Sequence, residues 1–284
     1  MRLDSDGRPS SRKNLMKLMQ RHQQGMSQRQ KTVYMQTIRN AVFMQFMSGD
    51  DFIKGGAGIQ IRYPLEEARM SKDVDATFND SEDAFELRLA KRLKEGWEGF
   101  TGEIISKEHG PRTLMPEGSR MTPMRVKLYY REQPFASIDL EILPDLSGCA
   151  EAAEERMDSG LKMMLSDLGF QHIAKPRVMN ATSQVAEKLH AISRPGRIRG
   201  RDLADIAVIA EHEAIDYEEL RQVARRIENV QGQHLIHMLV EDERESYRES
   251  FEYTDTRKTF DECWTITQRL LEQVDERQKD KWLL

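Results

Sequence analysis

The sequence predicts an α+β protein in which a small mixed-sheet domain is followed by an all-helical C-terminal domain. Short segments with alternating apolar residues, which are typical of half-buried strands, occur between residues 52 and 143. From residue 150 onward, apolar residues recur every three to four positions, which is typical of amphipathic helices. The character changes after Pro144, so we expect a domain boundary near residues 145–150.

The expected organisation has three parts. Residues 32–148 form the mixed-sheet domain and residues 149–284 form the helical domain. Residues 1–31 are polar and carry eight Lys or Arg against two Asp, so we expect a flexible basic arm with one short amphipathic helix. Such an arm is either a solvated tail or a contact for RNA phosphates. The candidate helices of the C-terminal domain are 151–168, 182–193, 202–212, 216–229, 231–250 and 258–279.

Composition indicates an ordinary soluble protein. The 284 residues carry a net charge of −5, which does not favour a globally basic nucleic-acid coat or an acidic tail. The two cysteines, Cys149 and Cys263, lie far apart, so they suggest neither a disulfide framework nor a zinc ribbon. The sequence has no run of eighteen apolar residues and no apolar N-terminal signal segment. We therefore expect a cytoplasmic protein that contacts no membrane.

Apolar periodicity and turn residues also predict the elements of the first domain. Ser81 is a suitable N-cap for the helix that follows it, and we expect that helix to back the sheet. The predicted elements are a helix over 32–47, a short strand at 52–53, a strand over 71–78, a helix over 81–97, a strand at 103–106, and a hairpin of 124–131 with 135–143.

A glycine-rich stretch follows the short strand at 52–53. Three of the four residues from 55 to 58 are glycine, beginning with the pair Gly55 and Gly56. Glycine lets the backbone turn tightly and approach a ligand closely. The stretch is therefore either a plain turn or a phosphate-binding loop.

Two aspartates lie on one face of the strand over 71–78. Asp73 and Asp75 alternate with Val74 and Phe78, which lie on the opposite face. Two neighbouring carboxylates repel one another unless a cation lies between them, and Mg²⁺ prefers oxygen ligands. The pair is a candidate site for Mg²⁺ or Mn²⁺, and the alternative is a solvated strand face.

A third carboxylate is expected in the same sheet. The second hairpin strand carries Asp139 and Glu141 on its polar face. A two-metal site needs a further carboxylate to hold both ions about 4 Å apart. Asp139 is the first choice for this role, and Glu141 is the alternative.

A second polar cluster lies in the helical half. Lys188 projects from the helix over 182–193, and four arginines follow within the eight residues 194–201. These arginines either bind phosphates or pair with nearby acids such as Asp202. Asp202 and Asp205 are spaced to share one face of the next helix. We expect His190 to be a packed or surface histidine rather than a base.

The order of these motifs resembles one known family. The glycine pair is followed by R-x-S-x-D-x-D from Arg69 to Asp75, then by a strand with a third carboxylate, then by EKLHA, an arginine and RDLxD ending at Asp205. This order is similar to that of the AbiE-type (AbiEii/AbiGii) abortive-infection nucleotidyltransferase toxins of the polymerase-β-like nucleotidyltransferase superfamily. The resemblance covers roughly residues 40–210.

The resemblance implies a nucleotidyltransferase domain followed by a helical domain that completes the NTP groove, with a divalent metal on the aspartates. Asp202 is expected to be structural, pairing with Arg194 or Arg201. The implied catalytic residues are Asp73, Asp75, Lys188 and Asp205; the implied nucleotide contacts are Gly55, Gly56, Arg69, Ser71, Lys188 and Arg194; the implied metal ligands are Asp73, Asp75 and Asp139.

The sequence departs from the family pattern at Ala57 and Gly58. Such proteins place Thr or Ser and then Ala after the glycine pair, so a hydroxyl expected to bond the triphosphate is missing here. Gly58 offers further backbone N–H groups, and Ser71 offers another hydroxyl. The resemblance also suggests Ser71 as a position where phosphorylation would silence the protein, because a phosphate beside Asp73 would repel the triphosphate.

The expected function is that of a bacterial phage-defence toxin. The resemblance implies transfer of NMP from an NTP to the 3′ end of a tRNA, which blocks translation, with a cognate antitoxin as partner. One alternative is transfer to a protein or small-molecule hydroxyl. Another is a non-catalytic protein that binds RNA or a partner and has kept the fold.

Overall fold

The chain forms two compact units, which we describe separately. The computed structural model describes residues 2–106, 121–231, 234–254 and 256–275. Unit 1 comprises Met1–Leu65, Met70–Asp145 and Ala153–Val178, and unit 2 comprises Glu66–Arg69, Leu146–Ala152 and Met179–Leu284.

Unit 1 is built on a mixed sheet, as the sequence predicts, but the sheet has seven strands because β6 and β7 join it from the part of the chain that was predicted to be helical. The strand order is β3-β4-β5-β2-β1-β7-β6. The pairs β2–β5 and β1–β7 are parallel, and the other neighbouring pairs are antiparallel. The strands are β1 (Phe52–Lys54), β2 (Asp73–Phe78), β3 (Phe100–Ser106), β4 (Thr122–Tyr130), β5 (Gln133–Pro144), β6 (Glu154–Glu155) and β7 (Arg177–Val178).

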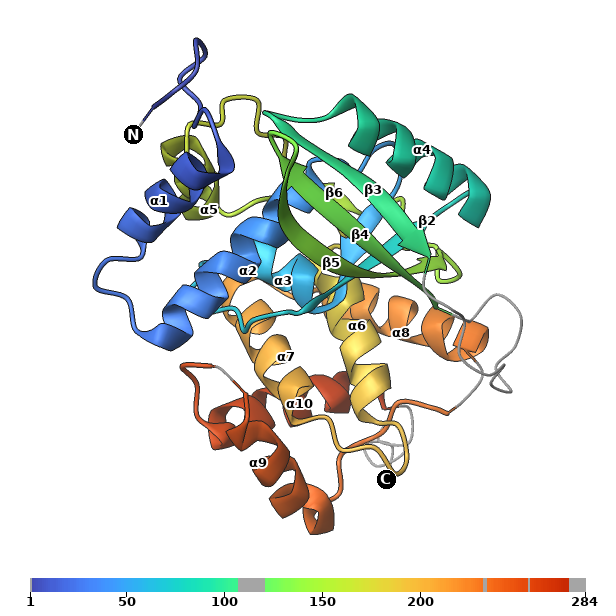
Figure 1. The fold of residues 1–284 in the computed structure, drawn as a ribbon. Coiled ribbons are helices and arrows are strands. Elements are labelled where there is room, and N and C mark those ends of the chain that lie inside the picture. Colours follow the sequence, from blue (N-terminus) through green and yellow to red (C-terminus); the bar gives the residue numbers. More distant parts are fainter. Residues whose placement is uncertain (1, 107–120, 232–233, 255, 276–284) are drawn as a thin grey trace, which may run out of the picture. The chain divides into compact units, whose positions relative to one another are not determined.

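The helices of unit 1 cover the sheet and close its core. Figure 1 shows α4 running along β3, and Leu89 and Leu93 of this helix are buried in the same core as the strand residues Val126 and Ile138. The helices are α1 (Arg12–His22), α2 (Gln28–Met44), α3 (Gly55–Arg62), α4 (Glu82–Glu95) and α5 (Ser159–Asp167).

Most predicted elements of unit 1 are confirmed. The hairpin is formed by β4 and β5, with a register shift after Leu128. The helix predicted after Ser81 is α4, and the Ser81 side chain accepts a hydrogen bond from the Ala84 N–H at 3.2 Å. The strand predicted at 103–106 is the end of β3. Residues 107–120 of the predicted loop lie outside the described residues.

The N-terminal segment contains the predicted short amphipathic helix. This helix is α1, and its residues Leu15 and Met19 are buried in the core of unit 1. The Tyr130 hydroxyl also donates a 2.6 Å hydrogen bond to the carbonyl of Pro9. Residues 1–31, predicted as a basic arm, therefore include a stretch that packs against the sheet unit.

Two predicted helices differ in the structure. The helix predicted from residue 151 begins only at Ser159, because Glu154 and Glu155 pair with β7 and Asp158 caps the first turn of α5. The helix predicted over 231–250 is replaced by an extended segment before the 3₁₀ turn η1 (Glu241–Glu243) and α9 (Arg244–Glu252). Residues 232–233 of that prediction lie outside the described residues.

Side chains from neighbouring helices explain the extended segment. The N–H of Ile236 bonds to the Glu228 carboxylate, and the N–H and C=O of Leu239 both bond to the Gln268 amide. The backbone polar groups thus find partners without forming a helix, and periodicity alone does not reveal such partners.

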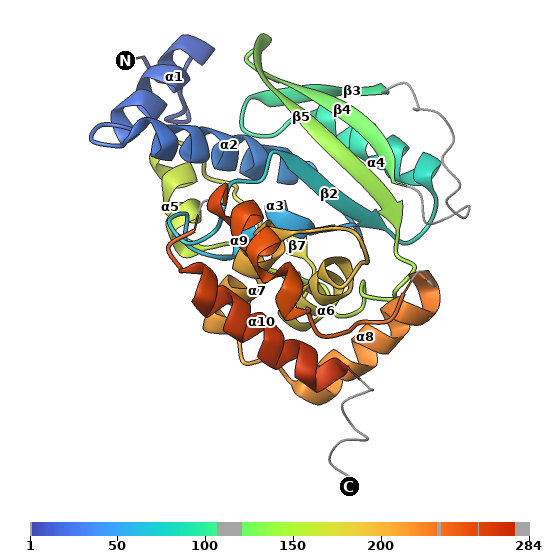
Figure 2. The same cartoon turned by 90° about the horizontal axis from the view of Figure 1, so that it is seen from below.

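Unit 2 is mainly helical in its described residues, and Figure 2 shows its helices clearly. α6 packs against α8, and α7 packs against α9 and α10. α6, α7, α8 and α10 agree with predicted helices, although residues 276–279 of the last prediction lie outside the described part. The remaining helices are α6 (Ala181–Ile192), α7 (Gly200–His212), α8 (Tyr217–Gln231) and α10 (Phe260–Val274).

Candidate active site

The carboxylates of β2 lie on the polar face of the sheet. Val74 and Ala76 are fully buried, whereas Asp73 is exposed and Asp75 is half-buried. This alternation follows from the pleat, which turns successive side chains to opposite faces. The predicted division of the strand into an apolar and an acidic face is confirmed.

The parallel pairing of β2 with β5 brings further carboxylates to this face. Asp73 lies directly across from Asp139, and Asp75 lies directly across from Glu141. Side chains at paired positions of neighbouring strands point to the same face. Asp73, Asp75, Asp139 and Glu141 therefore form one acidic patch, which we call the carboxylate face.

Arg125 of β4 contacts the carboxylate face from the next strand. Its Nε and NH2 groups both donate hydrogen bonds to Oδ1 of Asp139, each at 3.1 Å. The pair is roughly half exposed, with 48% and 41% of the two side chains accessible. This cation offsets part of the repulsion among the acids, and nothing in the sequence pattern singled it out.

The glycine pair meets the aspartate pair at the start of α3. Gly55 has a φ of +63° and begins this helix directly after β1, so the predicted turn is a strand-to-helix junction. A Cβ atom added to Gly55 would lie 1.9 Å from Oδ2 of Asp75. Only glycine fits both the backbone conformation and the space beside this carboxylate.

The first turn of α3 is suited to an anion. Lys54 occupies the N-cap position and makes no side-chain cap hydrogen bond in the described structure. The N-terminus of a helix carries unsatisfied N–H groups and a partial positive charge. Gly56 lies in this first turn, and Ala57 is fully buried behind it.

Ser71 is held inside unit 1 by local hydrogen bonds. Its hydroxyl donates to the backbone carbonyl of Asp73 at 3.0 Å, and its own carbonyl accepts from the Asn40 side chain at 3.2 Å. The residue is only 8% exposed. Ser71 therefore fixes the entry into β2 in this structure.

Unit 2 contains a buried group of charged side chains. Lys188 of α6 donates from Nζ to Oδ1 of Asp202 at 3.0 Å and to Oδ2 of Asp205 at 2.6 Å. Arg199, which belongs to neither α6 nor α7, also donates a hydrogen bond from Nε to Oδ2 of Asp202. All three central residues are nearly inaccessible to solvent.

Arg69 completes this group. Its NH2 donates to Oδ2 of Asp205 at 2.8 Å, so one carboxylate oxygen accepts bonds from both Arg69 and Lys188. Arg69 belongs to the short segment Glu66–Arg69 that is part of unit 2. We call the five residues Arg69, Lys188, Arg199, Asp202 and Asp205 the Lys188 cluster.

Opposite charges within the Lys188 cluster shift the pKa values of Asp202 and Lys188 toward their charged forms. Burial alone would raise the pKa of Asp202, but the charges of Lys188 and Arg199 and their hydrogen bonds lower this pKa to about 2. Burial would likewise lower the pKa of Lys188, yet the two aspartates raise it above the usual lysine value. Lys188 and Asp202 therefore remain charged at neutral pH.

The structure corrects the expected partner of Asp202. The sequence suggested Arg194 or Arg201, whereas the arginine on this carboxylate is Arg199. Arg199 lies immediately before α7 and three residues from Asp202, which places both groups on the first turn. Arg197 and Arg201 are exposed, and Arg194 is half-buried.

His190 does not belong to the Lys188 cluster. His190 is packed, as predicted, and its ring stacks on that of His234 with centroids 4.1 Å apart. Burial and the neighbouring imidazole lower the pKa of His190 to about 4, so it is neutral at physiological pH.

The predicted site residues other than Arg194, which is half-buried and belongs to neither set, thus form two groups. The structure brings Gly55, Gly56, Asp73, Asp75 and Asp139 together in unit 1, with Ser71 leading into β2. It brings Arg69, Lys188 and Asp205 together in unit 2. Sequence reasoning missed Arg125, whose role depends on strand register, and did not single out Arg199 among the four arginines as the one that pairs with Asp202.

Comparison with known proteins shows the family. A family model described as "Nucleotidyl transferase AbiEii toxin, Type IV TA system" matches residues 48–279. The chain belongs to this family. The matched range includes both the carboxylate face and the Lys188 cluster, so AbiEii membership rests on far more than the local motifs. No curated protein matches the chain.

As a member of the AbiEii family, the chain is a nucleotidyltransferase of the toxin class. The family implies an NTP as substrate and a cognate antitoxin as partner. Within the described ranges, the helices are all too short or too polar to cross a membrane. The family match confirms, at the level of the family, the resemblance seen in the sequence.

We predict that Gly55→Ala destabilises the fold more than a matched glycine change. Gly49→Ala is the control, because Gly49 has a similar φ of +67° but an added Cβ would meet no atom within 4 Å. Both variants strain the backbone by about 1–3 kcal/mol, and only Gly55→Ala also displaces the Asp75 carboxylate. Urea unfolding would measure the difference, and equal losses for the two variants would contradict the contact.

We also predict a pH-dependent effect of Asp202→Asn. The pKa of Asp202 is depressed in the folded protein, so its stabilisation is present above about pH 4 and is lost as the pH falls toward 2. The variant should lose on the order of 2 kcal/mol of unfolding free energy at pH 7, and less near pH 2. Asp242→Asn, in an exposed turn, is the control. A loss that is the same at both pH values would contradict this assignment.

Proposed function

We propose that the protein transfers NMP from an NTP to an acceptor hydroxyl with the help of Mg²⁺ or Mn²⁺. The observation that supports this most is the carboxylate face beside the N-terminus of α3, in a chain of the AbiEii family. Acidic side chains and a helix N-terminus are complementary to a metal–triphosphate complex.

The residues of the carboxylate face fit a hard divalent cation. Asp73, Asp75 and Asp139 offer only oxygen donors, and their mutual repulsion favours a cation among them. When bound there, Mg²⁺ neutralises the phosphates and lowers the charge that the attacking oxygen meets. Asp139, or Glu141 across from Asp75, is suited to accept the proton of the acceptor hydroxyl.

Each unit offers groups that we propose as phosphate contacts: the backbone of α3 in unit 1, and Lys188 and Arg69 in unit 2. Gly55 and Gly56 permit the close approach of a phosphate to the first turn of α3. Lys188 and Arg69 supply positive charge that offsets the charge on the leaving pyrophosphate. Asp205 holds both cations on one oxygen, so we assign it a positioning role toward them.

The acceptor is proposed to be RNA, specifically the 3′ end of a tRNA in the cytoplasm. Arg197, before α7, and Arg201, in the first turn of α7, are exposed and would contact a nucleic-acid backbone. Modification of a tRNA end blocks translation, which would make the protein toxic and useful in phage defence. The cognate antitoxin would act by binding or by phosphorylation of Ser71.

Ala57 favours a second candidate function. A hydroxyl-bearing residue is absent at this buried position of α3, which would weaken the grip on the triphosphate. A non-catalytic protein that binds RNA or a partner is therefore the alternative, together with transfer to a protein or small-molecule hydroxyl.

We predict that Asp73→Asn and Lys188→Ala abolish transfer of label from α-labelled NTP and abolish growth inhibition in a bacterial host. Asp73 is exposed, so its variant should fold normally, and circular dichroism would check this for both proteins. Asp242→Asn and the largely exposed Lys91→Ala should retain activity.

Incubation with each NTP, Mg²⁺ and total RNA or total protein would measure the transfer. Label in tRNA is the expected result. Label in protein or in a small molecule would replace the proposed acceptor, and full activity of Asp73→Asn would refute the catalytic assignment. Absence of any metal-dependent turnover would favour the non-catalytic alternative.

A further inference from the structure

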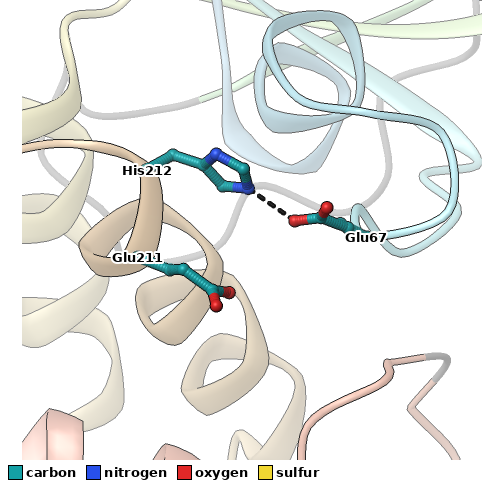
Figure 3. A group of neighbouring side chains, drawn as sticks. All are labelled: Glu67, Glu211 and His212. Atoms are coloured by element: carbon teal, nitrogen blue, oxygen red, sulfur yellow. Dashed lines mark hydrogen bonds and ion pairs between the residues drawn. The ribbon is translucent and has the colours of Figure 1, made fainter.

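A second group of metal-ligand side chains lies in unit 2, separate from the carboxylate face. It consists of Glu67, Glu211 and His212, and one ligand atom from each lies within 4.8 Å of the other two. In Figure 3, Glu67 of the 66–69 segment and His212 at the end of α7 point toward one another, and Glu211 extends from the same end of α7 beside them. Among the described residues, this is the one group of three such side chains whose ligand atoms all lie within 4.8 Å of one another.

The donors suit a transition-metal ion better than Mg²⁺. Imidazole nitrogen and carboxylate oxygen are both ligands of Zn²⁺, and the two carboxylates balance its charge. His212 is also the last residue of α7, where the partial negative charge of the helix end favours a cation.

The present distances are close to those that an ion would require. Ligand atoms around tetrahedral Zn²⁺ are about 3.3 Å apart, given bonds of about 2.0–2.1 Å. Nε2 of His212 and Oε2 of Glu67 are 2.5 Å apart and would separate slightly, while the third ligand would move inward. Both paired side chains are about 30% exposed, so they have room to adjust.

Lys258 is the cation that already contacts this group. Its Nζ lies 2.6 Å from Oε2 of Glu211. A carboxylate has two oxygens, so Glu211 is able to keep Lys258 on one oxygen and bind a metal ion with the other. Such outer contacts commonly orient metal-bound carboxylates.

Glu67 links this group to the Lys188 cluster through a short segment of chain. Glu67 lies two residues before Arg69, and both side chains are bonded to α7, at His212 and Asp205 respectively. Ala68 between them is buried. An ion bound at Glu67, Glu211 and His212 would pin this segment to the helix and so hold Arg69 on Asp205.

We propose that Glu67, Glu211 and His212 form a structural site for a divalent transition-metal ion of the Zn²⁺ class, which fixes the segment carrying Arg69. The metal site itself does not depend on the proposed nucleotidyl transfer; only the value of a fixed Arg69 rests on that function.

Zn²⁺ titration of the full-length, chelator-treated protein tests this site. Isothermal calorimetry should show a Zn²⁺ site that is weakened at least about tenfold in both His212→Ala and Glu67→Gln. His172→Ala is the matched control, because His172 also bonds to a glutamate, Glu98, at 2.6 Å but does not belong to a three-ligand group in the described residues. Asp73→Asn should also bind Zn²⁺ normally, which separates this site from the carboxylate face.

Hydrogen exchange provides a readout apart from activity. Zn²⁺ should slow exchange of the backbone amides at residues 66–69 in the parent protein and in Asp73→Asn, but not in His212→Ala. No Zn²⁺ binding, binding unaffected by His212→Ala, or binding lost in Asp73→Asn would each overturn the proposal. Loss of nucleotidyl transfer alone would leave it standing.

Discussion

The parallel register between β2 and β5 is the constraint on which the acidic face depends. It sets Asp73 across from Asp139 and Asp75 across from Glu141, while Val74, Ala76, Leu140 and Ile142 fill the core. A slip of one residue would turn every acid of one strand into the apolar core, at a cost far above that of a local adjustment. The hydrophobic core therefore fixes the acidic face. Arg125 offsets part of the repulsion within this face, and Gly55 leaves the space that the Asp75 carboxylate occupies.

The Lys188 cluster differs from the carboxylate face in that its opposite charges are buried and paired with one another. Its charges are buried, and a buried charge is tolerated only when it is paired and hydrogen-bonded. Asp205 joins Lys188 to Arg69, and Asp202 joins Lys188 to Arg199, so each central group contacts at least two others of the cluster. Within the cluster itself, three cations face two carboxylates.

The sequence predicted the mixed sheet, the hairpin, most helices and the same-face carboxylates, because each follows from local periodicity. Features that depend on distant partners were not predictable in this way. The extended segment after α8 relies on Glu228 and Gln268, and the late start of α5 relies on pairing between β6 and β7. Asp202 was assigned the wrong arginine because spacing alone does not separate four arginines on one loop. The group of Glu67, Glu211 and His212 joins segments about 145 positions apart, which no local motif reveals.

We propose that the carboxylate face binds the catalytic metal and, together with the first turn of α3, the triphosphate. A crystal structure of the protein with Mn²⁺ and a non-hydrolysable NTP analogue would test it most directly, because Mn²⁺ gives an anomalous signal. We expect an anomalous peak within coordination distance of Asp73 and Asp75, with the triphosphate reaching the first turn of α3. A well-occupied nucleotide whose metal and phosphates lie away from these residues would contradict the account.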